Sequence, residues 1–186
     1  MERGARAVPF DGFHHVTLVA GDPAANVGFT TELLGLRLLN VYEVASLGER
    51  FDFVLFLGVF YHLRHPLLAL DLIREHVAKN LLLFATLQRG EDTIFTPAND
   101  YDFFDECPFV EPGFPRLHFV EQRYAGHPTN WFIPNRAASE AMLRSAGFEI
   151  IERAESEVVL AGIAEPTGCH DGPRAAYPSR GPRETA

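Results

Sequence analysis

Residues 51–73 read FDFVLFLGVFYHLRHPLLALDLI, a stretch that joins a strand, a polar loop and a helix. Residues 51–58 are apolar at nearly every position, which predicts a strand buried on both faces, as in a parallel sheet. Gly58 ends this run, and Pro66 suits the first turn of a helix expected over residues 66–78. The loop between them carries four polar or aromatic side chains: Tyr61, His62, Arg64 and His65.

The rest of the chain alternates between strand and helix patterns. The expected strands are residues 14–20, 37–44, 80–87, 149–155 and 157–165, and the expected helices are residues 22–35 and 136–148. Alternation of this kind predicts an α/β fold. We expect a partial Rossmann-like sheet, mostly parallel, with an antiparallel C-terminal hairpin and helices on its faces. Small molecules bind such sheets outside the carboxyl ends of the strands, so the polar loop after Gly58 lies where a ligand is expected.

Composition narrows the class of protein. The chain has 186 residues, 47% of them hydrophobic, and a net charge of −9. Because binding through nucleic-acid phosphates depends on Lys and Arg, we expect a small-molecule substrate and not a nucleic-acid partner. Cys107 and Cys169 form no disulfide or zinc pattern. No signal peptide or membrane-length apolar run occurs, which predicts a cytoplasmic protein without a membrane partner.

Several motifs together are more specific than this periodicity. FDFVLFLGVFYHLRHPLLAL, LLLFATL, PTNWFIPN and EAMLRSAGFEIIE resemble the later half of class I S-adenosylmethionine-dependent methyltransferases. The branch they resemble is that of the tRNA wobble-uridine carboxymethyl-transferring enzymes, over about residues 37–160. The resemblance implies a seven-stranded sheet, of which this segment would supply the fourth to seventh strands.

The resemblance also implies roles for individual residues. S-adenosylmethionine, or a derivative of it, would contact Leu57, Gly58 and Tyr61 through its methionine part, and Tyr42 and Glu43 through its adenine. Asn130 and Trp131 fall on the acceptor side. The family pattern assigns no role to His62 or Arg64, which are candidates because their loop can position or deprotonate an acceptor. We therefore predict Tyr61 and His62 as catalytic residues, Tyr42, Glu43, Leu57, Gly58 and Tyr61 as cofactor-binding residues, and Arg64, Asn130 and Trp131 as substrate-binding residues.

The first residues resemble another family. GFHHVTLVAGDPAANVGFTTELLGLRLL looks like the opening of the vicinal oxygen chelate superfamily of glyoxalases and dioxygenases, where His15 would match a metal ligand. The resemblance ends near Leu38, and one imidazole does not hold a catalytic metal, which needs about three protein ligands. We therefore predict no metal site. The expected organisation is a truncated glyoxalase-like segment (1–36), a methyltransferase-like domain (37–164) and a disordered tail (165–186).

The methyltransferase pattern lacks two parts. Neither the glycine-rich loop after the family's first strand nor the acid after its second strand has a counterpart, so the cofactor-binding half is expected to be missing. The bare edge of strand 51–58 would also need cover. We expect residues 14–35 to dock there, or a second copy of the chain to form a homodimer.

Three functions follow from these patterns. The first is methyl transfer to a small molecule or, less expected, RNA. The second is a non-catalytic remnant or binding module produced by fusion of two truncated domains, and the third is a metal-dependent chelate enzyme. The predicted site residues also have purely structural interpretations: Tyr61 and His62 can pack at a strand end, and Trp131 can fill the core. We expect core or lid packing for Phe109, Phe114 and Phe119.

Overall fold

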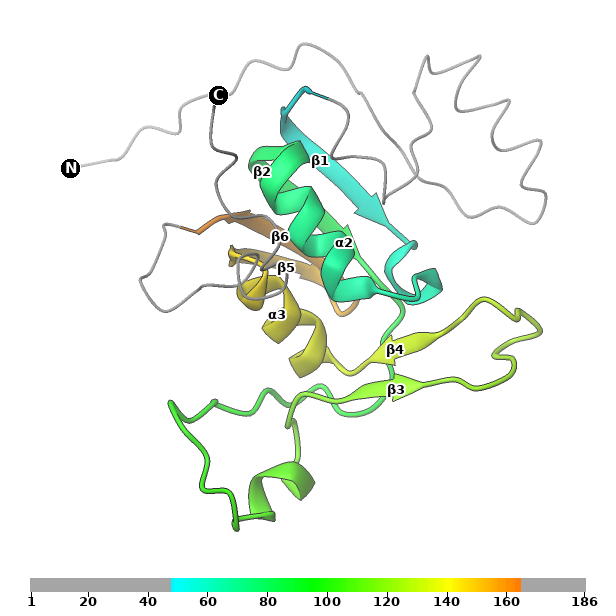
Figure 1. The fold of residues 1–186 in the computed structure, drawn as a ribbon, viewed down its shortest axis with the longest axis vertical. Coiled ribbons are helices and arrows are strands. Elements are labelled where there is room, and N and C mark those ends of the chain that lie inside the picture. The colour runs from blue at the N-terminus through cyan, green and yellow to red at the C-terminus, as the bar shows by residue number, and fades with distance from the viewer. Residues whose placement is uncertain (1–47, 165–186) are drawn as a thin grey trace, which may run out of the picture.

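The computed structural model describes residues 48–164 (Figure 1). The expected elements over residues 14–44 and the tail from residue 165 lie outside this range. So do three residues with predicted or alternative roles, His15, Tyr42 and Glu43.

A four-stranded sheet forms the centre of the domain. Its strands are β1 (Phe51–Leu57), β2 (Ala78–Ala85), β5 (Phe148–Glu155) and β6 (Val158–Ile163), in the order β1-β2-β6-β5. β1 and β2 are parallel, whereas β6 pairs antiparallel with both β2 and β5. Three strands thus share one direction, and the α/β class and the C-terminal hairpin are confirmed. A mostly parallel sheet was expected, but in the sheet that the structure describes β1 and β2 form the one parallel pair, because β6 inserts between β2 and β5.

The position of β6 follows from its composition. VVLAGI is apolar throughout and buried at three of its six positions, whereas FEIIERAE in β5 is exposed at six of eight. The apolar strand therefore takes the inner place and the charged strand forms the edge, as the desolvation of charged groups requires. β1 lies at the other end of the described order. Cover of its outer edge by another segment or a second chain stays a prediction.

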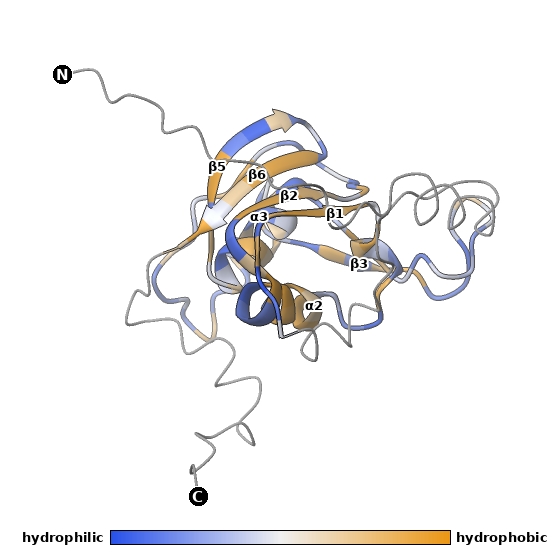
Figure 2. Cartoon of the chain, turned by 90° about the horizontal axis from the view of Figure 1, so that it is seen from above, coloured by the Kyte–Doolittle hydropathy of each residue, from blue (hydrophilic) through white to orange (hydrophobic). Residues whose placement is uncertain are grey.

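Two helices pack on one face of the sheet (Figures 1 and 2). Pro66 opens α2 (Pro66–Leu72) at its first position, and the chain then continues as the π-helix η4 (Ile73–Val77), where one regular helix was expected. α3 (Arg136–Ser145) begins at Asn135, whose side chain accepts a hydrogen bond from the backbone N–H of Ala138. The core between helices and sheet is apolar and includes Val54, Phe56, Phe60, Leu70, Leu82, Phe84, Leu143 and Phe148.

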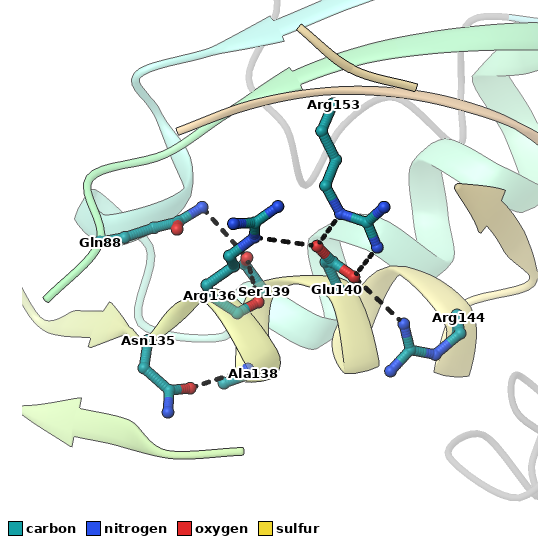
Figure 3. Close-up of polar contacts among 8 residues, drawn as sticks. All are labelled: Gln88, Asn135, Arg136, Ala138, Ser139, Glu140, Arg144 and Arg153. Carbon is teal, nitrogen blue, oxygen red and sulfur yellow. Dashed lines mark hydrogen bonds and ion pairs between the residues drawn. The ribbon is translucent and has the colours of Figure 1, made fainter. Parts of the chain in front are cut away.

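A buried carboxylate ties α3 to the edge strand. Glu140 is 1% exposed and lies within 4 Å of three arginines, Arg136, Arg144 and Arg153 (Figure 3). Burial alone would raise the pKa of Glu140, but the hydrogen bonds and charges of Arg153 and Arg136 hold it below its usual value. The carboxylate therefore stays ionised inside the domain.

A long excursion connects β2 to α3. It contains the 3-10 helix η5 (Cys107–Val110) and an antiparallel ribbon of β3 (Leu117–Phe119) and β4 (Phe132–Pro134). Figure 1 shows this excursion extending away from the sheet. Among the helices of residues 48–164, none is long and apolar enough to cross a bilayer.

Candidate functional site

The carboxyl ends of β1 and β2 lie side by side. Leu57 is in register with Ala85, and the N–H of Gly58 donates a 2.9 Å hydrogen bond to the Ala85 carbonyl. Gly58 has a φ of +69°, a conformation that glycine adopts without the steric cost a side chain would bring. The chain thereby turns into the short 3-10 helix η3 (Phe60–His62) at this edge of the sheet.

The structure brings the two predicted loops together. The N–H of Trp131 donates a 2.8 Å hydrogen bond to the carbonyl of Tyr61. The guanidinium of Arg64 lies 4.2 Å from the centre of the Trp131 ring, a cation–π contact. Residues 61–64 and 130–131, which are far apart in the sequence, therefore form one surface.

His62 is held in a defined tautomer. Its Nδ1 lies 3.2 Å from the carbonyl oxygen of Thr129 and 3.1 Å from the Thr129 hydroxyl. A carbonyl only accepts hydrogen bonds, so we assign the proton to Nδ1 and a lone pair to Nε2. Burial lowers the pKa of His62; the Thr129 hydrogen bond opposes this effect and the charge of His127 adds to it. The ring is accordingly neutral at pH 7, and Nε2 can accept a proton.

Tyr61 is a hydrogen-bonding group and not a base. Its ring packs against His62 with centroids 4.4 Å apart. Burial, followed by the negative charge of Glu157, raises the pKa of the Tyr61 hydroxyl above its ordinary value. The hydroxyl therefore keeps its proton at neutral pH and can donate it in a hydrogen bond.

Asn130 contains an unsatisfied acceptor. Its side chain is 5% exposed, and its Nδ2 donates a 2.9 Å hydrogen bond to the carbonyl of Tyr124. Its Oδ1 has no hydrogen-bond partner in the part of the chain that the structure describes. Because a buried polar atom without a partner costs about 1–3 kcal/mol, this atom marks a place where a ligand donor would be favourable.

The sequence did not reveal the contribution of Glu157. This residue lies in the β5–β6 turn, which reaches the site because Val158 is in register with Ala85 at the end of β2. The Glu157 carboxylate accepts a hydrogen bond of 3.1 Å from the N–H of Gln88 and lies 3.6 Å from Nη1 of Arg89. It also lines a cavity of about 150 Å³ together with Gln88, Arg89, Gly90, Glu91, Asp92, Arg136 and Ser156. The expected C-terminal hairpin was the one sequence signal that could have indicated this position, because its turn returns to the carboxyl edge of the sheet.

The outcome for the predicted residues is as follows. Tyr61, His62, Arg64, Asn130 and Trp131 gather at one edge, with Leu57 and Gly58 leading into it. Within residues 48–164, no three His, Cys, Asp or Glu side chains cluster as a metal ion would need. The individual roles stay predictions.

Comparisons with known proteins agree with the predicted relation over part of the chain. No family model matches the sequence. It is 30% identical over 121 residues to a tRNA U34 carboxymethyltransferase of Wolinella succinogenes, covering 64% of this chain and 36% of that protein. It is 34% identical over 100 residues to a tRNA U34 carboxymethyltransferase of Pseudomonas aeruginosa (strain LESB58), covering 54% of this chain and 25% of that protein.

The chain thus spans between a quarter and about a third of the length of these curated relatives. Among solved structures, the N-terminal domain of EvdMO1, crystallised with SAH and D-fucose, superposes with a TM-score of 0.47 and 23% identity. That match covers 76% of this chain and 61% of the EvdMO1 chain. The sequence similarity supports a methyltransferase-type domain. The glyoxalase-like character of residues 10–38 stays a prediction.

Proposed function

We propose that this chain is an incomplete methyltransferase-type domain, and that its remaining part of the site transfers a methyl group from S-adenosylmethionine, or a derivative, to a small-molecule acceptor at the carboxyl ends of β1 and β2. One observation carries the proposal: the 2.8 Å bond from Trp131 to Tyr61, which joins the loop expected at the cofactor to the loop expected at the acceptor. The sequence similarity to carboxymethyltransferases over part of the chain supports it.

The described residues fit the methionine end of such a cofactor. Gly58 has no side chain at the tight turn after β1, so a ligand can approach the backbone there, and Leu57 beside it is only half-buried. The Tyr61 hydroxyl can donate a hydrogen bond, and Asn130 offers an unsatisfied acceptor. Tyr42 and Glu43 would hold the adenine. When bound, the cofactor supplies an electrophilic methyl group on a sulfonium.

His62 is the candidate general base. A base for an acceptor hydroxyl or amine must be unprotonated near pH 7 and must present a lone pair. The neutral imidazole, with its proton fixed on Nδ1 by Thr129, meets both conditions through Nε2. The Arg64–Trp131 pair offers a cationic and aromatic surface that can orient the acceptor.

The acceptor we propose is small. The two relatives are named for action on tRNA. This chain has a net charge of −9, which opposes the phosphate contacts that bind RNA.

A thermal-shift titration with S-adenosylmethionine and with SAH tests cofactor binding. A ligand at about 100 times its Kd stabilises the folded chain by about 2.7 kcal/mol, so the unfolding midpoint should rise with cofactor concentration. Tyr61→Phe removes only the hydroxyl and keeps the backbone bond to Trp131, so it should weaken the rise. Ile151→Ser, an exposed position on β5, is the matched control and should leave the rise unchanged.

Turnover distinguishes the proposal from the non-catalytic alternative. Transfer of a labelled methyl group to a pool of small metabolites, lost in His62→Gln with cofactor binding retained, would support catalysis. A midpoint shift without transfer to metabolites or to RNA identifies a binding module. No shift at millimolar cofactor overturns the proposed function.

A further inference from the structure

The excursion between β2 and β3 exposes large apolar side chains. Phe103 is 90% exposed, Phe104 87%, Val110 75% and Phe109 57%. We call these four residues the aromatic tip. Four large exposed apolar side chains within residues 103–110 exceed the scattered single ones that are normal on a monomer, and such a concentration is typical of an interaction surface.

The tip is ordered by its own hydrogen bonds. The Asp102 carboxylate accepts a 2.8 Å bond from the N–H of Phe104, and the Asp105 carboxylate accepts a 3.0 Å bond from the N–H of Cys107. The rings of Phe103 and Phe104 meet edge to face with centroids 5.1 Å apart. These turns fix the backbone that presents the two rings to solvent.

The base of the tip is anchored to the rest of the excursion. Phe114 contacts the rings of Phe95, Tyr101 and Phe109 at 5.5, 6.0 and 5.2 Å. Gly113 lies so close to Thr93 that an added Cβ would stand 2.4 Å from the Thr93 carbonyl oxygen. A preorganised loop loses little conformational entropy on binding, which favours its use as a recognition element.

The charge of the segment that carries the aromatic tip restricts the kind of partner that can bind it. Residues 91–115 contain no Lys, Arg or His, and their seven acids are Glu91, Asp92, Asp100, Asp102, Asp105, Glu106 and Glu111. Arg116, the next residue, donates from Nη2 to the carbonyls of Phe109 and Glu111 at 3.4 and 3.3 Å, so residues 91–116 carry seven negative charges and one positive charge. Such a segment repels the phosphates of RNA and of anionic membranes. It also opposes a second copy of a chain with a net charge of −9. The complement is an apolar pocket rimmed by Lys and Arg on another protein.

We propose that the aromatic tip docks into a basic-rimmed apolar pocket of a partner protein, with Phe103 and Phe104 as the anchors. Exposed aromatic anchors surrounded by polar residues are the arrangement in which a few side chains carry most of the binding energy. The proposal concerns a surface and not the catalytic edge, so it stands independently of the methyl-transfer function.

Cys107, exposed beside the tip, provides the handle for the test. The full chain carrying Cys169→Ser is labelled at Cys107 with a photoactivatable benzophenone and crosslinked in an extract of the cells that express it. Crosslinked peptides are identified by mass spectrometry, and the identified protein is then purified. Its affinity for the chain is measured at low and high salt.

We expect one crosslinked protein, with the crosslink next to a Lys or Arg of that protein. The Kd of its complex with this chain should rise at least about tenfold in the double variant Phe103→Ser/Phe104→Ser. The Kd of the native complex should also rise with salt concentration. Circular dichroism confirms that the double variant is folded. The control Ile151→Ser, which also replaces an exposed apolar side chain, should bind normally. Unchanged binding by the double variant, crosslinks only to RNA or to a second copy of the chain, or no crosslinked protein overturns the proposal.

Discussion

Arg153 donates two hydrogen bonds, of 2.6 and 2.7 Å, to the buried carboxylate of Glu140. The pair joins the exposed edge strand β5 to α3 (Figure 3), in addition to the apolar core that the two elements share. A two-point contact between a planar guanidinium and a carboxylate also fixes the angle between the two elements. The position of the edge strand therefore depends on this ion pair as well as on apolar packing.

Arg153→Met should lower the free energy of unfolding by about 2 kcal/mol at pH 7. The loss arises because Glu140 keeps its burial but loses its strongest partner, which Arg136 and Arg144 replace only in part from 3.5 Å. Urea denaturation provides the measurement. Arg144→Met removes one 3.5 Å contact and should cost less than about 1 kcal/mol. Equal losses for both variants would contradict the assignment of Arg153 as the strongest partner of Glu140.

The same pair has a pH signature. The pKa of Glu140 is depressed in the folded state, so its contribution is present above about pH 4.5 and is lost as the pH falls through the folded value. The native chain should lose stability in this acid range faster than Arg153→Met does.

Asp71 should change the pH dependence of stability in the direction opposite to that of Glu140. This side chain on α2 is 5% exposed, and burial, followed by repulsion from Glu75, raises its pKa from 3.8 to about 6. The folded state therefore prefers the protonated carboxyl, and stability falls as the pH rises from about 4 to 6. Asp71→Asn, which stays neutral, should stabilise the chain by about 2 kcal/mol at pH 7.5.

Urea denaturation at two pH values checks this expectation. The gain from Asp71→Asn should nearly disappear as the pH falls well below 3.8, where the native carboxyl is protonated in both the folded and the unfolded state. Glu75→Gln removes only the second cause and should give a smaller gain at pH 7.5. A gain of the same size at both pH values would show that the effect is not one of ionisation.

His62 should titrate below pH 6.5. Burial lowers its pKa and the charge of His127 adds to this, so His127→Gln should move the His62 pKa upward. Proton NMR follows the ring resonance, which His62→Gln identifies by its disappearance. Because the folded state favours the neutral ring, stability should also decline as the pH drops below about 6.5. A His62 pKa at or above 6.5 would show that burial does not control its titration.

Local patterns predicted the elements well, and the reasons are physical. The apolar run of residues 51–57 forms β1, Gly58 ends it with a positive φ, and Pro66 opens α2. Each of these depends on the residue itself and its neighbours. The π-helical end at Ile73–Val77 has no such local signal, so a regular helix was expected there.

Contacts between segments far apart in the sequence were harder to predict. Family resemblance assigned Tyr61 and Trp131 to one site, but their contact was not predicted, because no local rule joins residues 70 positions apart. The approach of Glu157 to the site, and of Arg153 to Glu140, depends on strand register and was not predicted. Phe114 packs in the loop as expected, but Phe109 and Phe119 are 57% and 56% exposed, which corrects their assignment to core or lid. An aromatic side chain alone does not reveal whether it covers the core or faces a partner.

Asp105 should control the reactivity of Cys107. The Asp105 side chain hydrogen-bonds this thiol and, together with its negative charge, raises the Cys107 pKa. The thiol is exposed, yet less of it is ionised at pH 8 than in an ordinary cysteine. Since the thiolate is the nucleophile, alkylation by iodoacetamide should be slow, and Asp105→Asn should accelerate it. Rates are measured in the Cys169→Ser background, with Asp100→Asn as the matched control. The pH profile should move to lower pH only in Asp105→Asn, because only this change removes the carboxylate that opposes ionisation; a parallel shift in the control would assign the effect to the overall charge of the loop.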